Sequence, residues 1–136
     1  MIPKTGDTLP PVQIAEVDTA AMKEWAVFLR DPNPIHLDPE IVKAKGLGDK
    51  VINQGPINVA YMINMLNAAY PTGTIESLDT RFLDNVYGGE AVVAFGTVTA
   101  VCQRDGATIV SCDIGLRVEG RKLAISGTDT VKLCDV

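Results

Sequence analysis

The chain has 136 residues, of which 46% are hydrophobic and 21% charged, and its formal net charge is −5. This composition is typical of a folded globular protein and not of a disordered one. The negative charge argues against nucleic acid as a general partner, because such binding depends on a basic face that neutralises phosphates. The length fits one domain, which we expect to span residues 1–136.

The sequence contains no obvious targeting or membrane segment. Its longest apolar stretch, about residues 59–70, is interrupted by asparagines and is too short to span a bilayer. No basic segment leads into an apolar one, as it would in a secretory signal. We therefore expect a cytoplasmic protein that does not bind membranes.

The three cysteines, Cys102, Cys112 and Cys134, form no CxxC pair. Zinc sites usually combine Cys and His ligands at short spacings, and this chain has a single histidine. We expect reduced, mostly buried thiols and no metal site.

The N-terminal part predicts a strand followed by a helix. Residues 12–17 alternate well enough for a strand. Asp18 or Thr19 can cap a helix over residues 20–30. Pro32 then prevents its continuation, because proline lacks an amide hydrogen and disfavours the helical conformation of its predecessor.

Two further helices are predicted before the C-terminal half. Asp38 is the expected cap of a short helix over residues 39–46. Residues 57–70 form the second, which is apolar on almost every side and ends before Pro71. A helix of this kind is normally enclosed by other elements.

The remainder predicts an antiparallel sheet. Asp105-Gly106 and Glu119-Gly120 are tight-turn signals. The strands between the turns have one apolar face, which needs a cover, and the enclosed helix is the obvious candidate. The expected strands are residues 74–83, 91–102, 108–118 and 123–133. A sheet wrapped around a long helix is the α+β hot-dog architecture, which we expect here.

The segment RDPNPIHLDP, residues 30–39, contains the only histidine of the chain. Its prolines preset the backbone, so that Asp31 and His36 can point to a common place at low entropic cost. A carboxylate and an imidazole together suit proton transfer, and Asn33 offers a donor and an acceptor for orienting either one. Spacing alone leaves open that Asp31 merely caps a turn.

A family resemblance is carried by three segments: DPNPIHLD, VINQGPINVAYMINML and RFLDNVYGGE. Together they resemble the MaoC-like dehydratase family, which includes the R-specific enoyl-CoA hydratases (hydratase 2). The resemblance covers nearly the whole chain. Its most specific part is the motif D-x-N-P-hydrophobic-H, matched by Asp31, Asn33, Pro34, Ile35 and His36.

The resemblance implies a hot-dog fold with a proline-rich overhang that carries the site. Asp31 and His36 then correspond to the catalytic dyad, and Asn33 to an orienting neighbour. The Gly55 amide corresponds to the donor to the thioester oxygen, a role that suits the free amides at a helix N-terminus. The implied reaction is reversible hydration of a trans-2-enoyl-CoA to a (3R)-3-hydroxyacyl-CoA. It needs no cofactor except coenzyme A as part of the substrate.

The chain departs from the family pattern at three places. Leu29-Arg30 replaces a small Ser-Gly pair, Gln54 replaces a histidine, and residues 83–85 stand where the family usually has proline. Gln54 is a candidate substrate contact, as are Arg81 and Phe82, which match the family's Arg-Phe pair. Other candidate contacts for coenzyme A phosphates, each also compatible with simple exposure to solvent, are Arg117, Arg121 and Lys122.

Two other hot-dog functions are compatible with the fold. Related thioesterases commonly place an acidic residue on the central helix, and residues 57–70 contain no Asp or Glu, which disfavours hydrolysis. A non-catalytic subunit that binds acyl-CoA within a heteromeric hydratase would not need both Asp31 and His36. The resemblance also implies pairing of two sheets, so we expect a homodimer or an assembly of dimers, or else a heteromer.

Overall fold

A computed structural model describes residues 2–121 and 123–134 of the chain. Lys122, a candidate phosphate contact, lies outside the described residues. The elements in chain order are β1 (Val12–Ile14), α1 (Thr19–Phe28), the 3₁₀ helix η1 (Pro34–His36), α2 (Pro39–Ala44), α3 (Gly55–Ala69), β2 (Thr74–Phe82), β3 (Val92–Arg104), β4 (Ala107–Val118) and β5 (Leu123–Leu133).

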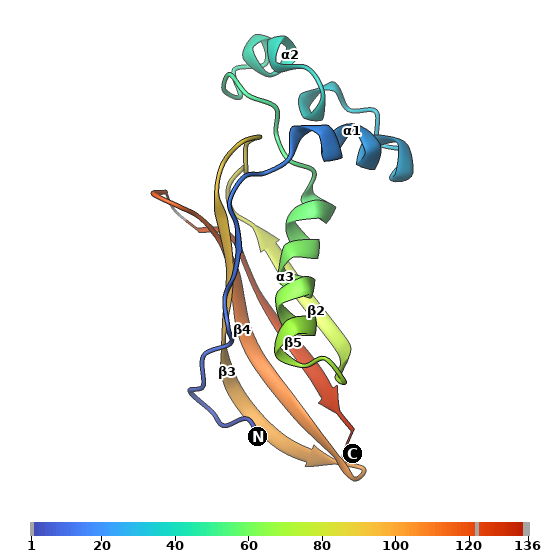
Figure 1. The fold of residues 1–136 in the computed structure, drawn as a ribbon, viewed down its shortest axis with the longest axis vertical. Helices are drawn as coiled ribbons and strands as arrows, with labels where there is room; N and C mark the ends of the chain where they lie inside the picture. Colours follow the sequence, from blue (N-terminus) through green and yellow to red (C-terminus); the bar gives the residue numbers. More distant parts are fainter. Residues whose placement is uncertain (1, 122, 135–136) are drawn as a thin grey trace.

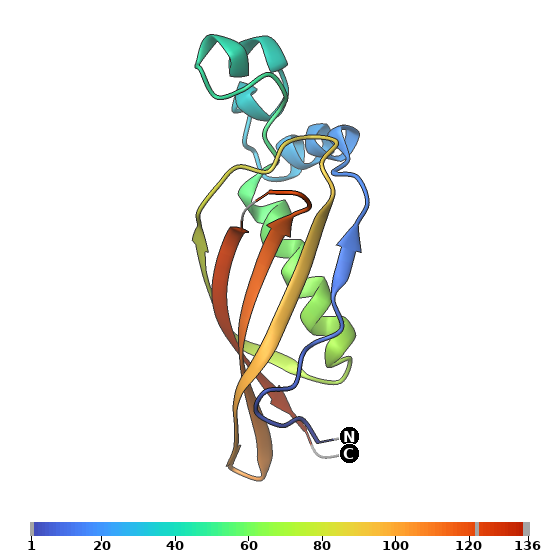
Figure 2. The ribbon, with the colours of Figure 1, turned by 90° about the vertical axis from the view of Figure 1, so that its left-hand side faces the viewer.

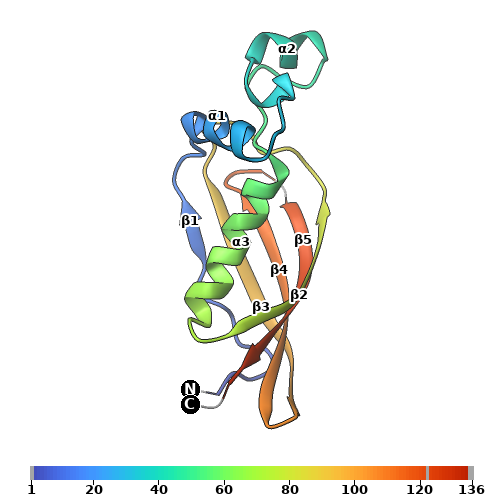
Figure 3. The ribbon, with the colours of Figure 1, turned by 90° about the vertical axis from the view of Figure 1, so that its right-hand side faces the viewer.

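The strands form one antiparallel sheet in the order β1-β3-β4-β5-β2, and α3 lies along its concave face (Figure 1, Figure 3). This arrangement confirms the predicted α+β hot-dog fold. The core forms between helix and sheet because alternate residues of each strand are apolar and face α3. Its fully buried members include Met62, Met65, Leu66, Leu116 and Ile125.

Helix α3 begins two residues earlier than predicted. Gly55 and Pro56 belong to its first turn, because proline is tolerated where no intrahelical amide bond is required. The helix is enclosed on one side, and its asparagines divide accordingly. Asn58 is buried, whereas Asn64 and Asn67 are exposed.

The strand boundaries follow the prediction within a few residues, except that β1 keeps only three of its six predicted residues. The pairing of β2 was not predictable from its neighbours in the sequence. It pairs with β5 at the sheet edge, and the connection 83–91 crosses the end of the sheet near the start of α3 (Figure 2). The turn at Asp105-Gly106 is confirmed, with positive φ at both residues.

Elements α1, η1 and α2 lie beyond the N-terminal end of α3 (Figure 1). Asp18 caps α1 by accepting a hydrogen bond from the Ala20 amide at 2.8 Å, as predicted. Asp38 caps α2 in the same way through the Glu40 amide at 2.9 Å. This layer of helices brings the proline-rich segment over the mouth of the central helix.

The three cysteines are free. Only Cys112 is buried, so the expectation of mostly buried thiols is wrong for Cys102 and Cys134, which lie on exposed parts of β3 and the C-terminal segment. Within the described residues, no helix is both long and apolar enough to traverse a bilayer.

Candidate active site

The His36 ring is held in one orientation by its own 3₁₀ helix. The Asn33 side chain caps η1 by accepting a hydrogen bond from the Ile35 amide at 3.3 Å. The Ile35 carbonyl in turn accepts one from the Ile52 amide at 2.9 Å, which fastens η1 to the segment before α3. The histidine side chain is 10% exposed. The backbone on both sides of the ring is therefore fixed.

The hydrogen bond of the ring determines its tautomer. His36 Nδ1 lies 2.6 Å from the Ile52 carbonyl oxygen. A carbonyl only accepts, so Nδ1 carries the hydrogen and donates. In the neutral imidazole, Nε2 is then an unprotonated acceptor, free to act as a base.

Asp31 reaches His36 because α1 ends in a Schellman motif. The Arg30 amide bonds to the Val27 carbonyl at 3.2 Å, and the Asp31 amide to the Ala26 carbonyl at 3.0 Å. Arg30 occupies the left-handed position of this motif, with φ of 51°. It corresponds to the glycine of the small Ser-Gly pair that is common in the family the sequence resembles.

The Asp31 carboxylate is oriented by the backbone of Asn33, whose amide donates to Oδ1 at 3.3 Å. The other oxygen, Oδ2, lies 3.5 Å from His36 Nε2. The structure thus brings the two predicted residues together, with Asn33 supporting both through its backbone and its cap. In the neutral tautomer, Oδ2 and Nε2 are both acceptors, so one water can donate a hydrogen bond to each of them.

Two backbone amides at the mouth of α3, those of Gln54 and Gly55, donate to no described residue, and of these two residues only Gly55 lines the cavity described below. Pro56 has no amide hydrogen, and the amides of Ile57 and Asn58 both donate to the Gln54 carbonyl, at 3.1 and 3.3 Å. No described residue accepts from the Gly55 amide in the first turn. This amide and the positive end of the helix dipole therefore suit an oxygen that gains negative charge.

Phe82 lies directly against Gly55. A Cβ atom added to this glycine would meet the ring Cζ of Phe82 at 3.1 Å. Any larger residue would require the Phe82 ring to shift by a few tenths of an ångström, whereas glycine leaves the backbone open to a ligand.

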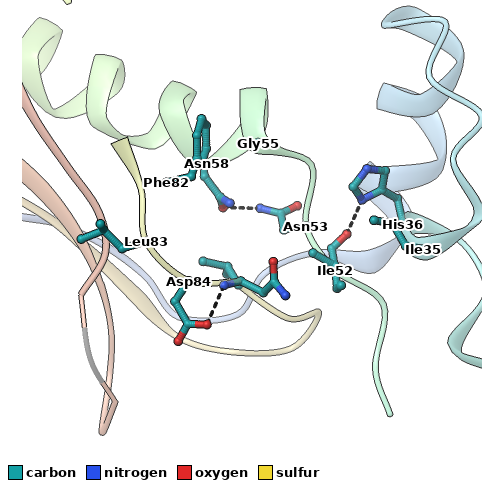
Figure 4. A pocket seen from close by; sticks show the side chains of 11 residues that line it. Ile35, His36, Ile52, Asn53, Gly55, Asn58, Phe82, Leu83 and Asp84 are labelled. Carbon is teal, nitrogen blue, oxygen red and sulfur yellow. Dashed lines mark hydrogen bonds between the residues drawn. The ribbon is translucent and has the colours of Figure 1, made fainter. Parts of the chain in front are cut away.

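His36 and Gly55 both line a cavity of about 440 Å³ (Figure 4). A second cavity of about 400 Å³ also reaches His36 but not Gly55. A ligand that contacts both the imidazole and the Gly55 amide must therefore occupy the first cavity. Its remaining lining residues are Ile35, Ile52, Asn53, Asn58, Phe82, Leu83, Asp84, Asn85 and Val86.

Two buried asparagines in this cavity were not recognised from the sequence. Asn53 and Asn58 are 3% and 4% exposed, and Asn53 Nδ2 donates to Asn58 Oδ1 at 2.7 Å. The sequence feature that could have indicated Asn58 is its place as a polar residue one turn after Gly55, in a helix that is mostly apolar. In the sequence, the asparagines of this helix served only as evidence against a membrane span.

Gln54 lies away from the cavity. Its side chain is fully buried, and Nε2 donates to the Met22 carbonyl at 2.7 Å, which ties the start of α3 to α1. Arg81 is exposed on β2 and is not among the residues that line the cavity. Among the predicted substrate contacts, Phe82 alone lines it.

Arg121 is engaged by acidic residues of the 83–91 connection. Its guanidinium lies 2.7 Å from a Glu90 carboxylate oxygen and 3.5 Å from one of Asp84. It also stacks over Tyr87, with 5.5 Å between the guanidinium carbon and the ring centroid. Arg121 thus braces one wall of the cavity. Arg117 stacks in the same manner over Phe95, at 5.1 Å.

Across residues 2–121 and 123–134, no group of three or more His, Cys, Asp or Glu side chains is arranged to hold an ion.

Comparison with known proteins gives one family match. The family model described as MaoC like domain matches residues 3–120. A mitochondrial 3-hydroxyacyl-[acyl-carrier-protein] dehydratase from Arabidopsis thaliana is 26% identical over 102 residues, which is 75% of this chain and 58% of that protein. The chain spans less than two thirds of the curated relatives it matches, 31% in one case and 58% in the other.

Solved structures share the fold at low sequence identity. The (R)-hydratase of A. caviae, involved in PHA biosynthesis, has a TM-score of 0.85 and 23% identity, with 96% of each chain covered. The ChsH1-ChsH2 complex of Mycobacterium tuberculosis has a TM-score of 0.81 and 19% identity, with coverage of 97% of this chain and 99% of the other.

Proposed function

Because the chain belongs to the MaoC-like domain family, we propose that it catalyses reversible hydration of a trans-2-enoyl-CoA to a (3R)-3-hydroxyacyl-CoA. The observation that carries this proposal is the pair of acceptors, His36 Nε2 and Asp31 Oδ2, which lie 3.5 Å apart, together with the cavity that His36 lines with Gly55, although Asp31 itself is not among its lining residues. Hydratases and dehydratases among its relatives and structural neighbours support a hydro-lyase.

In the proposed mechanism, a water bound between the two acceptors attacks C3 of the enoyl group. One of the two side chains takes the proton that the water loses, and a proton is delivered to C2 from the same side. The electron pair of the double bond moves onto the thioester oxygen, where the Gly55 amide stabilises the enolate. Water adds without net oxidation or reduction, so we propose no cofactor beyond the coenzyme A of the substrate.

The direct test is loss of enoyl-thioester absorbance with crotonyl-CoA and longer enoyl-CoAs. Asp31→Asn and His36→Ala should each lower kcat/KM by roughly 10²–10⁴-fold, the usual contribution of a general acid or base. Asp38→Asn is the matched control, because it makes the same chemical change on the same segment and asparagine still caps α2. Circular dichroism checks that each variant is folded.

Two results would contradict hydratase activity of this chain. An inert wild type that still binds acyl-CoA would support the alternative, an accessory subunit within a heteromeric hydratase. A heteromeric complex is among the structural neighbours. Release of free thiol from the acyl-CoA would instead identify a thioesterase. For an active enzyme, we propose a homodimer as the assembly.

A further inference from the structure

The buried pair Asn53 and Asn58 has hydrogen-bonding capacity that the protein does not use. Asn53 Oδ1 is buried and accepts no hydrogen bond from any described residue. Burial of an unpaired carbonyl oxygen is costly unless a ligand or water supplies a donor. Figure 4 shows this oxygen on the side of Asn53 that faces His36.

The pair offers one donor and one acceptor, however the two amides are oriented. One hydrogen bond joins them, at 2.7 Å. Turning both amides over exchanges their roles but again leaves one NH₂ group and one carbonyl oxygen for other partners. Tyr61 lies near Asn53 from within the core; burial raises the pKa of its hydroxyl, and the Asn53 amide partly offsets this.

A hydroxyl group matches this combination, since it donates one hydrogen bond and accepts others. A carboxylate does not, because it only accepts and requires a positive charge when buried. The described lining of the cavity includes Asp84 and neither lysine nor arginine. The complementary substituent is therefore neutral.

The position of Asn58 would place a hydroxyl group bound by the pair close to the thioester of the substrate. Residues three apart on a helix are neighbours on the same face, and side chains lean toward the helix N-terminus. Asn58 follows Gly55 by three residues, and its bond to Asn53 fixes its carboxamide beside the mouth of α3. The apolar part of the lining is formed by Ile35, Ile52, Phe82, Leu83 and Val86, and its other polar members are His36, Asp84 and Asn85.

We infer that the Asn53 and Asn58 pair selects an enoyl thioester whose acyl chain carries a neutral hydroxyl group near the double bond, in preference to a plain hydrocarbon chain. This inference rests on the proposed hydratase function and specifies its substrate class.

The test compares two enoyl-CoAs that differ by one hydroxyl, 5-hydroxy-trans-2-hexenoyl-CoA and trans-2-hexenoyl-CoA. The wild type should have the higher kcat/KM with the hydroxylated substrate. Asn58→Leu, which keeps the number and branching of the side-chain heavy atoms but has no hydrogen-bonding group, should lower the ratio of the two kcat/KM values by about fivefold to tenfold, the usual worth of a hydrogen bond to a neutral group. Using a ratio cancels the intrinsic reactivities of the two substrates.

Asn64→Leu is the matched control, because it makes the same change on the exposed side of α3 and should leave the ratio unchanged. If Asn58→Leu fails to fold, Asn58→Ala replaces it. Binding of the unreactive 5-hydroxyhexanoyl-CoA and hexanoyl-CoA to the wild type, by calorimetry, should show the same preference.

Three results would overturn the inference while leaving the hydratase function in place. One is a wild type that hydrates the plain substrate as well as the hydroxylated one. Another is equal loss of activity on both substrates in folded Asn58→Leu, which would assign the pair a structural role. The third is tighter binding of hexanoyl-CoA. Inactivity of the wild type on both substrates would instead contradict the proposed function itself.

Discussion

Arg30 is the residue that positions Asp31, and it does so in an unfavourable conformation. Its φ of 51° lies in the left-handed region, where a residue with a Cβ costs about 1 kcal/mol relative to glycine. Arg30→Gly should therefore raise the free energy of unfolding in urea by up to about 1 kcal/mol. Because the Schellman hydrogen bonds are preserved, hydratase activity should be retained.

Lys45→Gly is the control for this change. Lys45 also lies at a helix end, but its φ is −85°, so glycine brings no relief and should lower stability. Equal effects of the two substitutions would contradict a conformational origin. The sequence shows the departure at Arg30 from the related family, but only the backbone shows that this position is left-handed.

Asp129 on β5 is a buried acid without a function in the proposed reaction. It is 2% exposed, neither carboxylate oxygen has a hydrogen-bond partner among the described residues, and burial raises its pKa to about 6. Nearby, burial and the charge of Asp129 contribute to raising the pKa of Cys112 to about 12. The folded state therefore favours the protonated acid.

This shift predicts a pH dependence of stability. The folded protein binds the Asp129 proton more tightly than the unfolded chain does. The contribution of Asp129 to the free energy of unfolding is therefore fully present below about pH 4 and is lost as the pH rises through about 6. The loss should be roughly 3 kcal/mol and should vanish in Asp129→Asn. Urea unfolding from pH 4 to pH 7 measures it, and the exposed Asp113→Asn should keep the wild-type profile. A wild-type profile without this fall would contradict the prediction.

At the scale of elements, the proposed stabilisation of the enolate at the mouth of α3 depends on the Gly55 amide hydrogen. Gly55→Ala keeps this hydrogen but adds a Cβ against Phe82, whereas Gly55→Pro adds a comparable Cβ and removes the hydrogen. Proline is tolerated in the first turn of a helix, so the fold should survive both changes. Proline should lower kcat by a further 10²–10³-fold relative to alanine, roughly the contribution of one oxyanion donor.

The ratio of the kcat values of the two variants isolates the effect of the amide hydrogen, because both variants place a Cβ atom against Phe82. Stopped-flow measurement of enoyl-CoA hydration gives kcat, and thermal unfolding checks the fold. Equal rates in the alanine and proline variants would show that the Gly55 amide does not stabilise the enolate.

Helices and turns were predictable from the sequence where residues close together in the chain determine them. The caps at Asp18 and Asp38, the central helix and the turn at Asp105-Gly106 all follow from short-range chemistry, although α3 is enclosed on one side only. The pairing of β2 with β5 joins distant parts of the chain, and nothing in either strand specifies it. The Asn53 and Asn58 contact likewise arises only when the segment before α3 folds back along the helix. Motif residues of the candidate site were therefore predictable, whereas its cavity lining was not.

At the scale of the whole molecule, β2 leaves an open edge. It has nine residues and pairs with β5 on one side, whereas the opposite edge is the three-residue β1. A long unpaired edge is a ready template for pairing with another chain. We therefore expect sedimentation equilibrium to give twice the chain mass of 14.5 kDa.

The role of this edge can be tested at one position. The Leu83 amide bonds inward to the Ala124 carbonyl at 2.8 Å, and alternation along an antiparallel strand then directs the Thr80 amide to the open side. Thr80→Pro removes that donor without breaking the ladder to β5, so it should reduce the mass to that of a monomer. Thr80→Val keeps the donor and should remain dimeric. A dimeric proline variant would place the interface elsewhere, and a monomeric wild type would indicate that a different chain covers β2.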